Sequence, residues 1–327
     1  PIETVYVGGG TPSLLGARGL AALLAIERRL PGAGARERTV EVNPEHVDDA
    51  LLAALTEGGV SRVSIGAQSL DPAGLAELGR VHDDAAALRA IERARARGLR
   101  VSVDLMLGWR GQGEAALARD IARVVDAGAE HLSLYALTIE PGTPWVALVR
   151  RGLRILPDDD QQGALLEAAE RAIEARGLTH YEVASYALPG AEARHNLKYW
   201  TWQDYVGLGP SAHSARLLAS GATERRANPR GLAAWLEASG AAGFRERLEP
   251  VAAAAEGLWV GLRRLTGLEI ARYLERFPHT SRAWVDARVA GELARGNLEW
   301  IDGGARLRVA PGRWLWHDSI GAALIEA

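Results

Sequence analysis

The sequence TVYVGGGTPS, which occupies residues 4–13, decides the fold because it runs from a β-forming segment into three consecutive glycines. Val5, Tyr6 and Val7 form an unbroken apolar run, which predicts a strand covered on both faces. Three glycines remove every Cβ at the strand exit, so backbone amides can approach a ligand and φ can be positive without strain. The stretch predicts a ligand-binding loop, and the alternative is a tight strand-to-helix turn without a ligand.

The same strand-then-helix unit repeats downstream of this loop. Each expected helix carries an apolar stripe at a spacing of three or four residues, and each expected strand is a short β-forming run. Stacked units of this kind require a parallel sheet with right-handed crossovers, so we expect a barrel-like or doubly wound α/β fold. The expected strands are 4–7, 39–42, 62–65, 100–106 and 131–135, and the expected helices are 18–30, 48–57, around 88–94 and 117–125.

Polar or glycine positions follow the carboxyl end of every expected strand. They are Gly8 to Thr11, Glu41, Gln68, Asp104 and Thr138. Ligands bind at this end of α/β sheets, so residues far apart in sequence are expected to converge on one site. Taken singly, Glu41 and Asp104 also fit solvated strand-end carboxylates, but their recurrence at one end of the sheet favours a site.

The rest of the chain is less regular. We expect a helix within 153–177, a sixth strand at 181–184, and an aromatic-rich segment from about residue 186. Residues 219–249 are rich in alanine, glycine and arginine and predict a connector with one short helix near Trp235. Helices followed by a hairpin of 298–301 and 307–309 predict a small winged-helix-like α+β domain. The expected divisions are a barrel at 1–185, the aromatic-rich segment and connector at 186–250, and the C-terminal domain at 251–327.

Composition limits the classes of partner. The chain has 327 residues and a net charge of -3, which gives no general attraction to nucleic acid or anionic lipid. From residue 251 onward, ten arginines stand against nine acidic residues without a dense basic patch, which argues against nucleic-acid binding. No apolar run reaches the roughly 18 to 20 residues of a membrane span, and no signal peptide opens the chain, so we expect a cytoplasmic protein.

Five short motifs together resemble the radical S-adenosylmethionine (SAM) proteins related to oxygen-independent coproporphyrinogen III oxidase. They are GGGTP at 8–12, EVNPE at 41–45, VSIGAQS at 63–69, LGRVH at 78–82 and DLM at 104–106, and their order and spacing match as well. Within that superfamily, HNLKYW at 195–200 resembles the His-Asn-x-x-Tyr-Trp motif of the HemW heme chaperones, which the oxidases lack. The resemblance favours a heme chaperone of the HemW type, and a coproporphyrinogen III oxidase is the alternative.

The resemblance implies a partial (β/α) barrel of the radical SAM type and two sets of site residues. The set expected to surround SAM comprises Gly9, Gly10, Thr11, Glu41, Gln68, Arg80, Asp104 and Thr138. Carboxylates suit its cation and ribose hydroxyls, and the planar fork of Arg80 suits its carboxylate. The set expected to bind heme comprises His195 as an iron ligand, Asn196, Tyr199 and Trp200. A structural interpretation of the second set is an aromatic mini-core in which His195 bonds a loop carbonyl.

The absence of cysteine departs from the family pattern. Radical SAM proteins hold a [4Fe-4S] cluster with a three-cysteine loop after the first barrel strand, whereas this chain has no thiolate ligand for one. The resemblance places the first residues in the second strand, so we expect the first βα unit upstream and strand 5–7 at an uncovered edge. A scaffold that lost its cluster is a third interpretation. Relatives usually carry proline where this chain has Arg110, which weakens the match of the loop after Asp104.

The implied partner of a heme chaperone is a heme-accepting protein. The sequence does not identify this acceptor or the oligomeric state.

Overall fold

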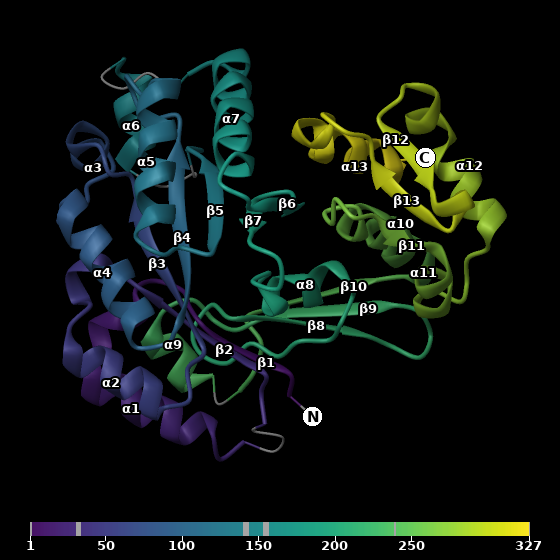
Figure 1. Ribbon diagram of the computed structural model, residues 1–327. Coiled ribbons are helices and arrows are strands. Elements are labelled where there is room, and N and C mark those ends of the chain that lie inside the picture. The colour runs from purple at the N-terminus through teal and green to yellow at the C-terminus, as the bar shows by residue number, and fades with distance from the viewer. Residues whose placement is uncertain (1, 31–33, 140–143, 153–156, 239, 327) are drawn as a thin grey trace. The chain divides into compact units, whose positions relative to one another are not determined.

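The computed structural model describes residues 2–30, 34–139, 144–152, 157–238 and 240–326 (Figure 1). The chain forms two compact units, Pro1–His195 and Asn196–Ala327, and each is described by itself. The division falls within α8 (Arg194–Trp200), a short helix that carries the HNLKYW sequence.

The first unit is built on a seven-stranded sheet with the order β1-β2-β3-β4-β5-β7-β6 (Figure 1). β1 to β5 are parallel, and β1 forms an edge of the sheet as predicted. The strands are β1 (Thr4–Val7), β2 (Glu37–Val42), β3 (Arg62–Gln68), β4 (Arg100–Leu107), β5 (His131–Ala136), β6 (Thr179–Glu182) and β7 (Ser185–Ala187). The helices are α1 (Gly16–Glu27), α2 (Asp49–Glu57), α3 (Pro72–Glu77), α4 (Asp84–Ala96), α5 (Glu114–Asp126), α6 (Pro144–Arg150) and α7 (Asp159–Glu174).

Local sequence sets where several of these helices begin. Asp48, Asp83 and Asp158 each precede a helix, and each side chain accepts a hydrogen bond from a backbone N–H of the first turn. Such caps satisfy amides that have no acceptor within the helix. The helices then bury their apolar stripes against the sheet, where Leu55 of α2 and Ile91 of α4 are fully buried.

Alternation of apolar and polar side chains along each parallel strand separates the two faces of the sheet. Apolar residues such as Val40, Val63 and Val103 are fully buried in the core formed with the helices. The residues between them project to the opposite face, because successive side chains of a strand point to opposite sides. We call this opposite side the polar face, and its residues include Thr4, Tyr6, Glu37, Thr39, Glu41, Arg62, Ser64, Ser102, Asp104, His131, Ser133 and Tyr135.

One sequence prediction for this unit is wrong and another needs its bounds corrected. The strand at 5–7 is not covered on both faces, because Tyr6 is 37% exposed on the polar face. The sixth strand expected at 181–184 is present as β6, but it ends at Glu182, and residues 183–184 form the turn of an antiparallel hairpin with β7, which begins at Ser185. Two intervening residues are too few for the crossover that a parallel neighbour requires.

The helix expected within 153–177 is present as α7, which begins at Asp159. Residues 153–156 lie outside the described part of the chain.

The second unit begins with an antiparallel sheet in the order β10-β9-β8. Its elements are β8 (His213–Leu217), β9 (Thr223–Ala227), α9 (Leu232–Glu237) and β10 (Phe244–Leu248). The short helix near Trp235 is present, but the prediction of an otherwise strandless connector is wrong. Charged residues occupy these strands and pair across them, as Arg225 does with Glu246 at 3.4 Å, so the apolar alternation typical of a strand is absent.

The C-terminal part of the second unit packs four helices and a three-stranded antiparallel sheet around its own core. Leu258, Tyr273, Val285 and Leu307 are fully buried there. The elements are α10 (Pro250–Gly261), β11 (Leu268–Glu269), α11 (Ile270–Arg276), α12 (Arg282–Ala294), β12 (Leu298–Ile301), β13 (Arg306–Val309) and α13 (His317–Glu326). This order agrees with the expected winged-helix-like arrangement, to which the structure adds β11 and the final helix α13.

None of the helices in the described residues is both long and apolar enough to span a membrane.

Candidate functional site

Glu41 of β2 holds the glycine loop against the end of β1. Its Oε2 accepts a hydrogen bond from the Gly9 backbone N–H at 3.0 Å, and its Oε1 accepts one from the Tyr6 hydroxyl at 2.7 Å. A Cβ at Gly8 would lie 2.5 Å from the Tyr6 ring and 2.7 Å from Glu41, so only glycine fits there. Gly9 and Gly10 have φ of 85° and 67°, and a Cβ on either would meet open space. The loop is therefore fixed on one side by a carboxylate and accessible to a ligand on the other.

Asp104 of β4 lies between two serine-bearing strands on the polar face. The Ser64 hydroxyl donates a hydrogen bond to its Oδ2 at 3.3 Å, and the Ser133 hydroxyl also donates to this carboxyl group. Burial raises the pKa of Asp104 to about 6, and the Glu41 carboxylate adds to this rise, whereas the serines and Arg80 oppose it. Asp104 can therefore change charge close to neutral pH in response to a nearby ion.

Arg80 supplies a cation beside these carboxylates. Its charge interacts with Glu45 and Asp104, yet its guanidinium makes no hydrogen bond or close ion pair with any residue that the structure describes. Burial lowers the pKa of Arg80. The LGRVH motif that carries Arg80 is held by His82, whose Nε2 forms a hydrogen bond with the Ala67 carbonyl at 3.1 Å and whose Nδ1 lies 3.2 Å from Glu45 Oε2. An unpaired planar fork in this position suits a carboxylate ligand.

Two other residues of the expected SAM set stand at the same end of the sheet. Gln68 ends β3 with a φ of 65°, where the register between β3 and β4 shifts. Positive φ outside glycine costs free energy and concentrates at functional sites. Thr138 is exposed two residues beyond the end of β5. Within the described residues, neither side chain hydrogen-bonds Glu41 or Asp104, whereas Glu41 binds the Gly9 amide and the charges of Glu41 and Arg80 act on Asp104.

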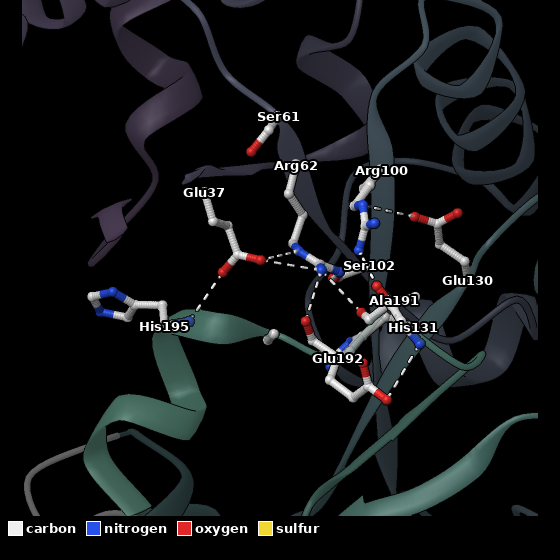
Figure 2. A network of polar contacts seen from close by, with 12 residues as sticks. Glu37, Ser61, Arg62, Arg100, Ser102, Glu130, His131, Ala191, Glu192 and His195 are labelled. Atoms are coloured by element: carbon white, nitrogen blue, oxygen red, sulfur yellow. Dashed lines mark hydrogen bonds and ion pairs between the residues drawn. The ribbon is translucent and has the colours of Figure 1, made fainter. Parts of the chain in front are cut away.

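His195 packs on β1. Its Nδ1 forms a hydrogen bond with the Thr4 hydroxyl at 2.9 Å, and its ring stacks on Tyr6 with centroids 5.1 Å apart. Its backbone N–H donates to Glu37 Oε1 at 3.0 Å (Figure 2). Tyr6 therefore contacts both Glu41, through its hydroxyl, and His195, through its ring.

Tyr199 and Trp200, at the other end of α8, line a cavity of about 350 Å³ in the second unit. The Tyr199 ring meets Tyr205 edge to face at 4.7 Å, and the Arg263 guanidinium lies 4.7 Å from the centre of the Trp200 ring. Five aromatic residues share the lining with arginines and acids, and the lining includes Trp202, Tyr205, Phe277, Arg216, Arg225, Arg276, Asp204 and Glu256 but neither His195 nor Asn196. The cavity offers flat apolar surface with a charged margin, which suits an aromatic ligand bearing acidic groups.

No cluster of three or more histidine, aspartate or glutamate side chains in the described residues could hold a metal ion.

Comparison with known proteins identifies the family. The pattern of the Radical SAM superfamily matches residues 1–124. "Heme chaperone HemW" of Bacillus subtilis is 32% identical over 332 residues, which are 99% of this chain and 86% of that protein. The chain belongs to the HemW family. The protein of the same name from Mycobacterium tuberculosis is 42% identical over 214 residues, which are 65% of this chain and 55% of that protein.

A solved structure has the same fold as this chain. Coproporphyrinogen III oxidase (HemN) from Escherichia coli, described as a radical SAM enzyme, superposes with a TM-score of 0.80 at 19% identity. The superposition covers 98% of this chain and 77% of that protein, and at this identity it supports the half-barrel fold alone. The chain spans little more than half the length of the Mycobacterium tuberculosis HemW.

Sequence analysis of this HemW chain did not predict three polar residues of the site: Tyr6, Ser64 and Ser133. Each lies on the polar face next to a residue of the expected SAM set. The alternation of apolar and polar residues in TVYV, VSI and HLSLY could have indicated them, because it places a polar side chain at every second position of neighbouring strands.

Proposed function

We propose that the protein is a heme chaperone that binds heme and transfers it to an acceptor protein. The observation that carries this proposal is α8, which begins with an imidazole held by Thr4 and ends with two aromatic residues that line a cavity. Imidazole is a common axial ligand of heme iron, and aromatic side chains provide flat apolar surface for a porphyrin. The relatives named as heme chaperones support the same function, and the chain is proposed to act in the cytoplasm.

In this proposal His195 ligates the iron, and the hydrogen bond between its Nδ1 and the Thr4 hydroxyl orients the ring. A hydrogen bond at the second ring nitrogen orients an imidazole and raises its basicity as a ligand. Tyr199 and Trp200 supply aromatic surface, and Asn196 is proposed to satisfy a polar group of the porphyrin. The likeness to HemN supports the fold only, whereas the HNLKYW sequence resembles the motif of the heme chaperones, so the oxidase remains the alternative.

SAM is the second proposed ligand, and the residues at the carboxyl end of the sheet fit it. Gly9 and Gly10 face open space, Glu41 and Asp104 offer oxygen acceptors, and Arg80 is available for a carboxylate. Thr11, Gln68 and Thr138 complete the proposed set at its periphery. SAM would supply a sulfonium cation and an adenosyl group there. A [4Fe-4S] cluster belongs to the family pattern, but no residue of this chain provides a thiolate for it.

Replacing His195 with alanine should weaken heme binding by more than about tenfold, because even partners that only orient a metal ligand contribute 10–100-fold. Titration of the chain with heme, followed by the Soret band, measures both affinity and ligation. Affinity of the unaltered chain should also fall at acid pH, because a protonated imidazole cannot ligate iron.

The control for this titration is His213→Ala, which removes an exposed imidazole at the start of β8. We expect its spectrum and affinity to match those of the unaltered chain. An unchanged Soret band and affinity in His195→Ala would instead leave the HNLKYW sequence as structural packing.

Replacing Gly10 with valine should weaken SAM binding by about tenfold or more. The added side chain fills the space over the loop, and the loss of one hydrogen bond from an amide to a charged group corresponds to roughly 1.5–3 kcal/mol. Calorimetric titration with SAM measures the change. Gly177→Val is the matched control, since Gly177 also has a positive φ of 83° and open surroundings but lies after α7. Equal affinities of the two variants would place the adenosyl site elsewhere.

A further inference from the structure

We infer that Glu37 and Arg62 are positioning residues for His195, so that this buried ion pair sets the affinity of the chain for heme. The inference rests on the proposed function, because it concerns the proposed iron ligand. It names two residues that do not touch heme themselves.

Glu37 is the first residue of β2 and Arg62 is the first residue of β3, so the pair lies at the end of these strands opposite to Glu41 and Gln68. Figure 2 shows the two side chains facing each other. Glu37 is 4% exposed and Arg62 is 1% exposed. Arg62 Nη2 and Nε lie 3.2 and 3.3 Å from Glu37 Oε2. A pair so well shielded from water holds its geometry firmly only if its remaining donors and acceptors are satisfied.

Arg62 also donates hydrogen bonds to the segment that leads into α8 and to β4. Its Nη2 donates to the carbonyl oxygens of Ala191 at 2.9 Å and Glu192 at 3.1 Å, and its Nη1 donates to the Ser102 hydroxyl at 3.1 Å. One guanidinium thus ties the chain just before His195 to three neighbouring strands. Arginine is suited to this role because its planar fork presents several donors in a fixed geometry.

The second oxygen of Glu37 reaches His195 directly. Oε1 accepts the hydrogen bond from the His195 backbone N–H, while Oε2 faces Arg62 (Figure 2). The main chain of His195 is therefore held from β2, and its ring is held from β1 by Thr4 and Tyr6. Because a ligating atom must be placed to within a fraction of an ångström, loss of either anchor should misplace the imidazole.

A glutamine at position 37 should break this arrangement without changing its size. Its amide has one acceptor oxygen and one donor nitrogen, whereas Glu37 accepts through both oxygens. Whichever way the amide turns, its NH₂ group faces either Arg62 or the His195 N–H, and both of these are donors. One of the two anchoring hydrogen bonds is therefore lost.

The same sheet offers a matched control. Arg38 pairs with Glu27 of α1 at 3.0 Å, and the two side chains are 11% and 10% exposed. This pair is on the helix-covered side of the sheet, whereas Glu37 and Arg62 lie on the polar face. Glu27→Gln therefore tests the general effect of weakening a buried ion pair.

The experiment compares Glu37→Gln, Glu37→Asp and Glu27→Gln in the full chain. Heme titration followed by the Soret band should give an affinity about tenfold weaker for Glu37→Gln, with a shifted Soret maximum. Glu37→Asp, which keeps two acceptor oxygens, should recover part of the affinity. Glu27→Gln should leave the heme affinity and the Soret spectrum unchanged, even if it lowers the melting temperature as much as Glu37→Gln does.

Hydrogen exchange of the segment 188–200 provides the readout that does not depend on heme. Exchange should accelerate there in Glu37→Gln and remain unchanged in Glu27→Gln. Equal losses of heme affinity in both glutamine variants, or unchanged exchange in Glu37→Gln, would overturn the positioning role. If the unaltered chain bound no heme, the proposed function would fail and take the link to heme affinity with it, while exchange would still decide whether Glu37 anchors His195.

Discussion

Replacing Arg62 with methionine should lower the free energy of unfolding by about 3–5 kcal/mol, the usual effect of removing one partner of a buried ion pair. Methionine fills much of the same volume but leaves the Glu37 carboxylate without its cation in a site that is 4% exposed. The carbonyl oxygens of Ala191 and Glu192 lose their donor as well. Urea unfolding followed by circular dichroism should show a lower midpoint with a similar slope.

Two further variants separate this effect from a general loss of charge. The double variant Glu37→Leu, Arg62→Met removes both charges and should recover part of the stability, because no uncompensated carboxylate remains buried. Arg97→Met breaks a largely exposed pair with Asp49 and should change the free energy of unfolding by less than about 1 kcal/mol. A loss below about 1 kcal/mol in Arg62→Met would show that the pair is unimportant for stability.

The sequence predicted the first unit well because its signals are local. Apolar stripes at helical spacing recur in the helices that follow the parallel strands, aspartate caps begin α2 and α4, and β2 to β5 appear where they were expected. The edge position of β1 was also predicted correctly. These features depend on neighbouring residues in the chain, so a single sequence contains them.

The Glu37–Arg62 pair could not be predicted in the same way. Glu37 and Arg62 are 25 residues apart, and the Ala191 carbonyl that Arg62 binds is 129 residues further along the chain. No periodic pattern connects positions at such separations. The same limit applies to Tyr6 and His195, whose stacking depends on how α8 returns to the first strand.

The strands β8 to β10 were missed for a different reason. Their sequences, such as TERRA at 223–227 and FRERL at 244–248, are rich in charge and lack an apolar face. Pairing between opposite charges on adjacent strands, as between Arg225 and Glu246, stabilises them instead. The composition of these segments resembles that of a connector. Their strand structure depends on charged partners that lie on another strand, which composition does not show.

Replacing Asp104 with asparagine should stabilise the protein at neutral pH by about 2 kcal/mol. The pKa of Asp104 is raised from 3.8 to about 6, chiefly by burial, so the folded state binds this proton more tightly than the unfolded chain does. Stability therefore falls as the pH rises from about 4 to about 6 and remains lower above that range. A shift of this size corresponds to at most about 3 kcal/mol, and asparagine is neutral at every pH, so it removes the penalty. The stability lost to the charged form is consistent with a role in binding, since functional sites often retain such unfavourable groups.

The pH dependence of the difference between Asp104→Asn and the parent is the decisive measurement. Urea unfolding at pH 7.5 should show the gain, and at pH 4 the gain should largely disappear because Asp104 is then protonated in the folded protein. Asp84→Asn is a control in which the free energy of unfolding should change in the opposite direction. A hydrogen bond from Arg123 lowers the pKa of Asp84, so its charge favours folding at neutral pH. A gain that persists unchanged at pH 4 would mean that asparagine stabilises by packing, and no gain at pH 7.5 would mean that the serines and Arg80 fully compensate the buried charge.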